Sequence, residues 1–294
     1  MAEDKPSVTA KNPDLIPRIA VAVIGIPLLV SLAIYGPNWS VWLIIMTAAG
    51  IAAWEFLRMT LQRDFRYDGA VALSVTALTT ATVYWTDTAA LIGTAMFASL
   101  VAIFSTAMFT MRNHQDALQR LGGMFTTFLY VTLLFGAYTL LIKASALDSE
   151  ASRASAVTYQ AGWFLLPMFI IWGGDTGAYF VGRAFGTHKL APKISPGKTW
   201  EGAAGGIAAS IVGAFIAAWL LPLPSISPGL LIAIALPAAA LGQIGDLCMS
   251  LVKRATGFKD SSSILYGHGG MLDRVDALIF ASPWILIARE LWLH

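Results

Sequence analysis

The sequence has 294 residues, of which 57% are hydrophobic and only 12% charged, with a formal net charge of +2. A soluble domain carries about 25% charged residues, so this composition excludes an ordinary water-soluble fold and indicates a chain buried in a lipid bilayer. The single cysteine, Cys248, excludes a disulfide-stapled secreted scaffold.

Nine apolar segments follow one another along the chain, each about 17 to 25 residues long, as a membrane-spanning helix requires. They cover residues 19–35, 41–59, 69–85, 89–111, 122–142, 161–181, 202–221, 229–252 and 275–292. The sequence therefore predicts an all-α polytopic membrane protein with about nine transmembrane helices, the first of them retained rather than cleaved as a signal peptide. We assign about five spans to an N-terminal region, residues 1–150, and about four, with the most polar loops, to residues 151–294.

The distribution of positive charge predicts the orientation in the membrane. With the N-terminus inside, 16 of the 19 Lys and Arg residues fall in the N-terminal tail or in loops on the same side, and only Lys143, Arg153 and Arg289 fall elsewhere. Because cytoplasmic loops carry the excess of Lys and Arg, we expect an N-in, C-out arrangement in the inner membrane.

Two acidic residues lie inside apolar segments, near the ends that this orientation places at the cytoplasm. Asp175 follows Gly173-Gly174 in the sixth segment, and Asp246 follows Gly245 in the eighth. A charge at the centre of a membrane helix costs about 2.5–3.5 kcal/mol on insertion scales, and such residues are functional by default. We therefore expect a polar pocket open to the cytoplasm. Pairing with a neighbouring Lys or Arg for packing alone is the alternative.

Further polar residues are expected beside this pocket. Four residues share one face if the eighth segment is a helix: Asp246, Met249, Ser250 and Lys253. A Lys253 that only reaches the membrane edge is the alternative. Asp273 and Asp276 also share a face at the start of the ninth segment, although acids there suit the helix dipole as well. Carboxylates suit Mg²⁺, and they have no matching Cys or His cluster that would indicate zinc.

Two loops contain residues that suit phosphate groups. Gly267, Gly269 and Gly270 precede the ninth segment and let backbone amides approach an anion. His268 among them is either a phosphate contact or a turn-stabilising residue. The sixth loop contains Arg183 and the run Ser195-Pro196-Gly197-Lys198-Thr199-Trp200-Glu201. Its Gly-Lys-Thr is not a P-loop, because that motif needs Gly at position 192, which is proline, and no buried strand precedes it.

Three stretches of the C-terminal half carry spaced motifs. The longest runs from Ser250 through Lys253-Arg254 and Lys259-Asp260 to Gly267-His268-Gly269-Gly270-x-x-Asp273-Arg274-x-Asp276. The others are Asp175-x-x-Ala178-Tyr179-x-x-Gly182-Arg183-x-Phe185-Gly186 and Ser195-Pro196-x-Lys198-Thr199-x-Glu201-Gly202. Together they resemble the signature of the phosphatidate cytidylyltransferases, also called CDP-diacylglycerol synthases. The motifs cover residues 175–276, and the layout of spans extends the likeness weakly over the rest.

The resemblance implies that CTP and phosphatidic acid react to give CDP-diacylglycerol and pyrophosphate. It implies Mg²⁺ held by Asp246 and Asp273, with Asp276 close by, a second, monovalent cation such as K⁺, and a homodimer in the lipid bilayer. We expect no nucleic acid partner. The residues expected to act on the reacting groups are Asp246, Lys253, Asp273, Asp276 and Lys198. Those expected to bind substrate are Asp175, Arg183, Ser195, Thr199, Glu201, Ser250, Arg254, Lys259, Asp260, His268, Gly269, Gly270 and Arg274.

The chain departs from the family pattern at three positions. Met249 stands where the family usually has an acid, Tyr266 where it usually has Pro and Ser262 where it often has Gly. Met249 removes one expected cation contact and leaves slower turnover or a shifted substrate open. The alternatives are a CTP-dependent transferase for another lipid phosphate or a polyprenol, a transporter, and a non-catalytic scaffold. A transporter would show related halves, and the sequence has no obvious repeat.

Overall fold

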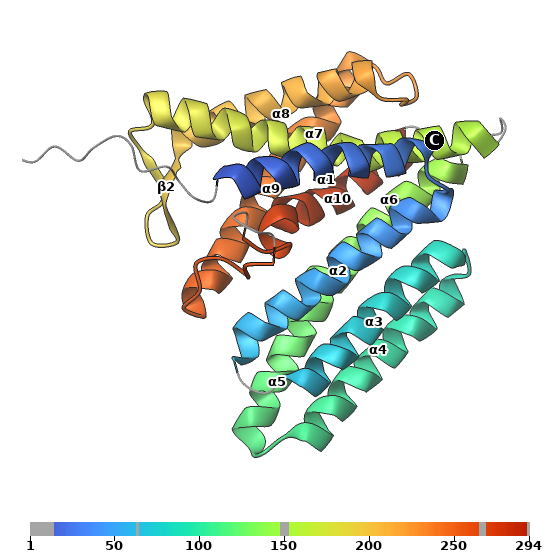
Figure 1. The fold of residues 1–294 in the computed structure, drawn as a ribbon, viewed down its shortest axis with the longest axis vertical. Helices are drawn as coiled ribbons and strands as arrows, with labels where there is room; N and C mark the ends of the chain where they lie inside the picture. Colours follow the sequence, from blue (N-terminus) through green and yellow to red (C-terminus); the bar gives the residue numbers. More distant parts are fainter. Residues whose placement is uncertain (1–14, 63–64, 148–152, 265–268, 293–294) are drawn as a thin grey trace, which may run out of the picture.

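The computed structural model describes residues 15–62, 65–147, 153–264 and 269–292 (Figure 1). The N-terminal helices are α1 (Leu15–Tyr35), α2 (Asn38–Leu61), α3 (Arg66–Trp85), α4 (Ala89–Thr110), α5 (His114–Thr127) and α6 (Leu133–Leu147), with a π-helical turn, η1 (Phe128–Thr132), between α5 and α6. The C-terminal helices are α7 (Arg153–Phe185), α8 (Trp200–Leu220), α9 (Pro228–Ala255) and α10 (Leu272–Trp292). Two short strands, β1 (Lys189–Ala191) and β2 (Ser195–Thr199), connect α7 to α8.

Most of the helices are suited to a bilayer. Six segments are long and apolar enough to cross a membrane, namely Trp39–Leu61, Ala89–Thr110, His114–Ala144, Gln160–Phe185, Trp200–Leu220 and Pro228–Ala255. The chain is therefore a helical membrane protein, as its composition predicts. The other three expected spans are also helical, but within the described residues they are not both long and apolar enough to be counted as spans. Helix α1 contributes only the shorter apolar stretch Val23–Tyr35, α3 is rich in threonine, and α10 carries charged residues near both ends.

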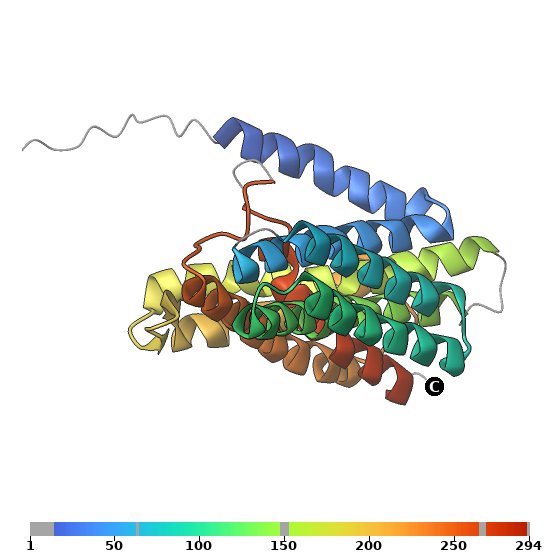
Figure 2. The same ribbon diagram turned by 90° about the horizontal axis from the view of Figure 1, so that it is seen from below.

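The helices form a bundle whose two edges differ. Figure 1 shows α7 and α8 side by side at one edge, α3 and α4 at the opposite edge, and α2, α6 and α10 between them. Helix α1 lies on one face of the bundle (Figure 2), where it contacts α7 and α2. The β1–β2 hairpin and the C-terminal ends of α2 and α9 lie at the same end of the molecule. There the Gln62 side chain donates to the Thr256 carbonyl at 2.6 Å.

Glycines allow α7 and α8 to approach closely. A Cβ on Gly213 of α8 would overlap the Phe169 carbonyl oxygen of α7, and one on Gly174 would overlap the Ser210 hydroxyl. Membrane helices associate largely through such close van der Waals packing, which small residues permit. The glycine-rich segments of the sequence therefore fix the spacing between the two helices that border the cavity described below.

This packing predicts a site-specific cost of adding one methyl group. Alanine is the better helix former by about 1 kcal/mol, yet we expect Gly213→Ala to destabilise the protein by about 1–3 kcal/mol, because backbone rather than a flexible side chain blocks the Cβ. Gly93→Ala is the matched control, since nothing lies within 4 Å of a Cβ there. Thermal unfolding in detergent would show a lower midpoint for Gly213→Ala only. Equal midpoints would contradict this account of the interface.

The connection between α7 and α8 is more ordered than the loop that the sequence predicts. β1 and β2 pair antiparallel, with Lys189 opposite Thr199 and Ala191 opposite Ser195. The Thr199 hydroxyl then accepts a hydrogen bond from the Gly202 N–H at 3.1 Å and so caps α8. In the described part of the chain this hairpin is the only β-sheet, and it places Lys198 just before the start of α8.

Candidate active site

A cavity of about 550 Å³ lies between α7, α8, α9 and the hairpin. This volume is within the range of ordinary small-molecule sites, about 300–1,000 Å³. Six residues singled out from the sequence line it: Asp175, Arg183, Ser195, Lys198, Thr199 and Asp246. They come from three different elements, α7, β2 and α9. The fold therefore gathers residues that are up to 71 positions apart, as the interval from Asp175 to Asp246 shows. Tyr179 and Gln243 also line the cavity and were not among the expected site residues.

An ion pair joins two walls of this cavity. The Lys198 ammonium lies 2.5 Å from Asp246 Oδ2, and the Ser250 hydroxyl donates to Asp246 Oδ1 at 3.4 Å. Ser250 is four residues after Asp246 on α9, so the one-face expectation is confirmed for this pair. Both charged side chains remain partly exposed to the cavity. They are therefore accessible to a charged ligand as well as to each other.

The α7 wall presents an acid, a phenol and a guanidinium in line. Asp175, Tyr179 and Arg183 are spaced four residues apart on the helix and all line the cavity. The Arg183 guanidinium donates to the Tyr179 hydroxyl at 2.9 Å. Gln243 on α9 donates from Nε2 to the Ala203 carbonyl at 2.9 Å, which ties α9 to α8 behind the cavity.

Thr199 and Glu201 have partners within the protein. Thr199 caps α8, as described above. The Glu201 carboxylate accepts from the Thr187 hydroxyl at 2.7 Å and the His188 backbone N–H at 3.2 Å, and it lies 2.6 Å from His188 Nδ1. Glu201 is thus bound to the segment that leads into the hairpin. Its expected substrate contact stays a prediction.

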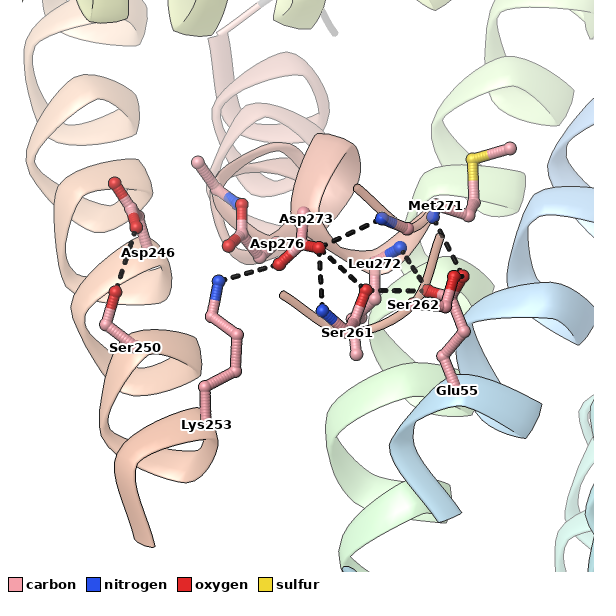
Figure 3. Close-up of polar contacts among 12 residues, drawn as sticks. Glu55, Asp246, Ser250, Lys253, Ser261, Ser262, Met271, Leu272, Asp273 and Asp276 are labelled. Carbon is pink, nitrogen blue, oxygen red and sulfur yellow. Dashed lines mark hydrogen bonds and ion pairs between the residues drawn. The ribbon is translucent and has the colours of Figure 1, made fainter. Parts of the chain in front are cut away.

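A second polar cluster lies where α9 and the following loop meet α10 (Figure 3). The Lys253 ammonium lies 2.6 Å from Asp273 Oδ1. Asp273 Oδ2 accepts from the Ser261 N–H at 2.8 Å, the Ser261 hydroxyl at 2.9 Å and the Gly270 N–H at 3.0 Å. The loop therefore holds the Asp273 carboxylate in one orientation, with an ammonium group on its other oxygen.

Asp276 lies between this cluster and the cavity. Asp276 is only 6% exposed, and its Oδ1 accepts a hydrogen bond from the Ala277 N–H at 2.7 Å. Helices α9 and α10 touch at this level, since a Cβ on Gly245 would lie 2.8 Å from the Asp276 carbonyl oxygen. Because Gly245 precedes Asp246, this contact places Asp246 of α9 and Asp276 of α10 at the same level of the two helices (Figure 3). Among the residues that the structure describes, however, no three His, Cys, Asp or Glu side chains are close enough to hold a metal ion.

The remaining expected site residues that the structure describes do not line the cavity. Arg254, Lys259, Asp260 and Arg274 are exposed at the end of α9, in the following loop and in the first turn of α10. Gly269 has a φ of 76°, a left-handed conformation that glycine adopts readily. His268, together with Gly267 and Tyr266, lies outside the described residues.

Two buried residues complete the comparison with the sequence. Met249 is 0% exposed and packs in the hydrophobic core, so this chain uses for packing the position where the sequence resemblance led us to expect an acid. Glu55, by contrast, is a buried carboxylate bound to the loop before α10 and was not an expected site residue. Its signal was present, since Glu55 is an acid within the apolar segment 41–59, as Asp175 and Asp246 are within theirs.

Comparison with known proteins points to one family. A family model described as the cytidylyltransferase family matches residues 16–292. A phosphatidate cytidylyltransferase of Haemophilus influenzae is 42% identical over 159 residues, which is 52% of this chain and 54% of the relative. The enzyme of that name from Brucella suis is 50% identical over 118 residues (40% and 43%), and that from Bacillus subtilis is 36% identical over 184 residues (56% and 67%). The chain spans about half the length of the first of these relatives.

Proposed function

Since the chain belongs to the cytidylyltransferase family, we propose that it transfers the cytidylyl group of CTP to phosphatidic acid, forming CDP-diacylglycerol and pyrophosphate. The observation that carries this proposal is the cavity, which brings Lys198 and Arg183 together with the Asp246 carboxylate. Basic groups suit the phosphates of both substrates, and a carboxylate suits a cation between them. The name shared by the relatives supports phosphatidic acid as the acceptor.

The proposed reaction is a displacement at phosphorus. A phosphate oxygen of phosphatidic acid attacks the α-phosphorus of CTP, the bond from that phosphorus to the bridging oxygen breaks, and pyrophosphate leaves with the electron pair. The nucleophile is already an anion, so the protein needs no strong general base. It has to align two anions and offset their repulsion. The residues that supply positive charge in this proposal are Lys198, Arg183, Lys253 and Arg274.

We propose that Asp246, Asp273 and Asp276 hold Mg²⁺, with K⁺ as a second cation. Carboxylate oxygens are donors that Mg²⁺ accepts where substrate phosphates complete its shell, and Asp246 and Asp273 each already face an ammonium group. Bound there, the ion would neutralise phosphate charge. Since no three candidate ligands of the described chain are close enough to bind an ion alone, the proposal requires the substrate phosphates as partners.

We also propose nine spans in the inner membrane, with the N-terminus and the site on the cytoplasmic side. In support, the C-terminal ends of α7 and α9 and the start of α8 meet around the cavity, and all are cytoplasmic ends in this arrangement. Arg58, near the C-terminal end of α2, belongs to the same end of the bundle. The homodimer and the division at residue 150 stay predictions.

The test is product analysis with purified protein in detergent. CTP, phosphatidic acid and Mg²⁺ are expected to give CDP-diacylglycerol and pyrophosphate in equal amounts, and omission of the lipid or of Mg²⁺ should abolish both. Replacing K⁺ by a large organic cation tests the second ion. Because the products are identified by mass spectrometry, the assay also separates the alternatives by their chemistry.

Three of the alternatives give distinct results in this assay. A transferase for another lipid phosphate would release pyrophosphate only with that lipid, whereas a polyprenol kinase would release CDP instead. A folded protein that binds CTP without turnover would support a non-catalytic scaffold. Any of these results would overturn the proposed reaction.

A further inference from the structure

A buried carboxylate of the N-terminal region holds the loop that leads to Asp273. Glu55 lies in α2 and is 0% exposed, and Figure 3 shows it pointing at the residues before α10. It accepts from the Ser261 hydroxyl at 3.0 Å and the Ser262 hydroxyl at 2.5 Å. It also accepts from the backbone N–H groups of Met271 at 3.0 Å and Leu272 at 2.8 Å. All four donors lie more than 200 residues later in the chain.

This arrangement replaces an ordinary helix cap. The first N–H groups of a helix lack partners within it, and the helix dipole favours a negative charge beside them. A buried carboxylate is in turn tolerated only where donors compensate for its lost hydration. Glu55 and the start of α10 therefore satisfy each other, and loss of the carboxylate would leave the N–H groups of Met271 and Leu272 without this acceptor.

The same residues link Glu55 to Asp273. The Ser261 hydroxyl lies 3.0 Å from Glu55 Oε2 and 2.9 Å from Asp273 Oδ2. A hydroxyl has one hydrogen to donate, so it serves one carboxylate at a time. Asp273 Oδ2 keeps the Ser261 and Gly270 N–H groups in either case. The two carboxylates thus hold Ser261 from opposite sides, and the orientation of Asp273 depends on where Glu55 places that residue.

Gly270 shows how closely Glu55 fits. A Cβ on Gly270 would lie 2.6 Å from both oxygens of the Glu55 carboxylate and would overlap the Ser261 hydroxyl. The Glu55 carboxylate therefore fills the space in which any larger residue at position 270 would have its side chain. Glycine at position 270 leaves room for the carboxylate because it has no side chain. The Gly270 N–H donates to Asp273 Oδ2 at 3.0 Å.

From these contacts we propose that Glu55 is a positioning residue, which fixes Ser261 and residues 269–272 so that Asp273 and Lys253 keep their orientation. This inference rests on the proposed function only for its effect on turnover. Its structural part, that Glu55 controls the donors of Asp273, stands on the hydrogen bonds alone. A cap that served only stability would protect the N–H groups of Met271 and Leu272 and leave those of Ser261 and Gly270 unaffected.

Amide hydrogen exchange of the Glu55→Gln variant, without substrates, separates these two roles. The amide group of Gln has nearly the same shape, but it donates where the carboxylate accepted. We expect the amides of Met271 and Leu272 to exchange about tenfold faster. Those of Ser261 and Gly270, which donate to Asp273, should accelerate as well. Unchanged exchange at Ser261 and Gly270 would overturn the proposal, whether or not the protein makes CDP-diacylglycerol.

The matched control is Asp68→Asn. Asp68 is also a 0% exposed carboxylate, in the neighbouring helix α3, and it pairs with Arg120 at 2.5 Å. Both variants should lower thermal stability, but only Glu55→Gln should lower kcat, by about tenfold, and raise the Mg²⁺ concentration needed for half-maximal rate. Equal losses of kcat in the two variants, or an unchanged Mg²⁺ requirement in Glu55→Gln, would contradict the positioning role and show that Glu55 only stabilises the fold.

Discussion

Replacement of Asp246 by asparagine should lower cytidylyl transfer at least about 100-fold, a loss typical of removing one electrostatic contact to developing charge. Asp246 is the acid of the cavity that lies 2.5 Å from the Lys198 ammonium. An asparagine there keeps the shape but neither attracts a divalent ion nor holds Lys198 by charge. The rate of pyrophosphate release at saturating CTP is the direct measurement. The fold should be unaffected, because the ion pair is partly exposed.

Asp87→Asn is the control for this prediction. Asp87 is also an acid paired with a lysine, Lys143, at 2.7 Å. It follows the C-terminal end of α3 and has no part in the cavity. We expect its rate to match that of the unaltered protein. A near-normal rate in Asp246→Asn would refute the metal-binding role of this residue and the cation site built on it.

Hydropathy predicted most of the helical layout. The expected span 89–111 is α4, Ala89–Thr110, almost to the residue. The acids within apolar segments then predicted a polar pocket, and Asp175, Arg183, Lys198 and Asp246 do line one cavity. The local sequence is sufficient to predict membrane helices, because each of them requires an apolar segment of a characteristic length.

Tertiary contacts account for what was missed. Glu55 is an acid within an apolar segment, but its partners could not be predicted, because its four donors lie more than 200 residues away in the chain. The β1–β2 hairpin was interpreted as loop, since its strands have only three and five residues. The contacts of the Glu201 carboxylate with Thr187 and His188 were not predicted either, and its expected substrate contact stays a prediction. The hydrogen-bond partners of a polar residue depend on the tertiary fold. A sequence motif shows that the residue is present but not which groups it contacts.

The pair Lys253–Asp273 allows a sharper separation of stability from chemistry. The two side chains are only 13% and 8% exposed, and their charged atoms are 2.6 Å apart. Breaking such a pair from one side leaves an uncompensated charge and costs about 3–5 kcal/mol, whereas removing both charges often costs little. Asp273→Asn and Lys253→Met should therefore each lower the thermal unfolding midpoint, and the double variant should recover most of that loss.

Activity should not recover with stability. If Asp273 holds the cation and Lys253 faces the substrate phosphates, each single variant loses about 100-fold in turnover, and the double variant remains at least as slow as the slower single one. Thermal unfolding and CDP-diacylglycerol formation are measured on the same four proteins. A double variant that regains both would show that the pair serves packing alone. Recovery of stability with continued loss of turnover is the outcome expected of groups whose charges are required by the substrates rather than by the fold.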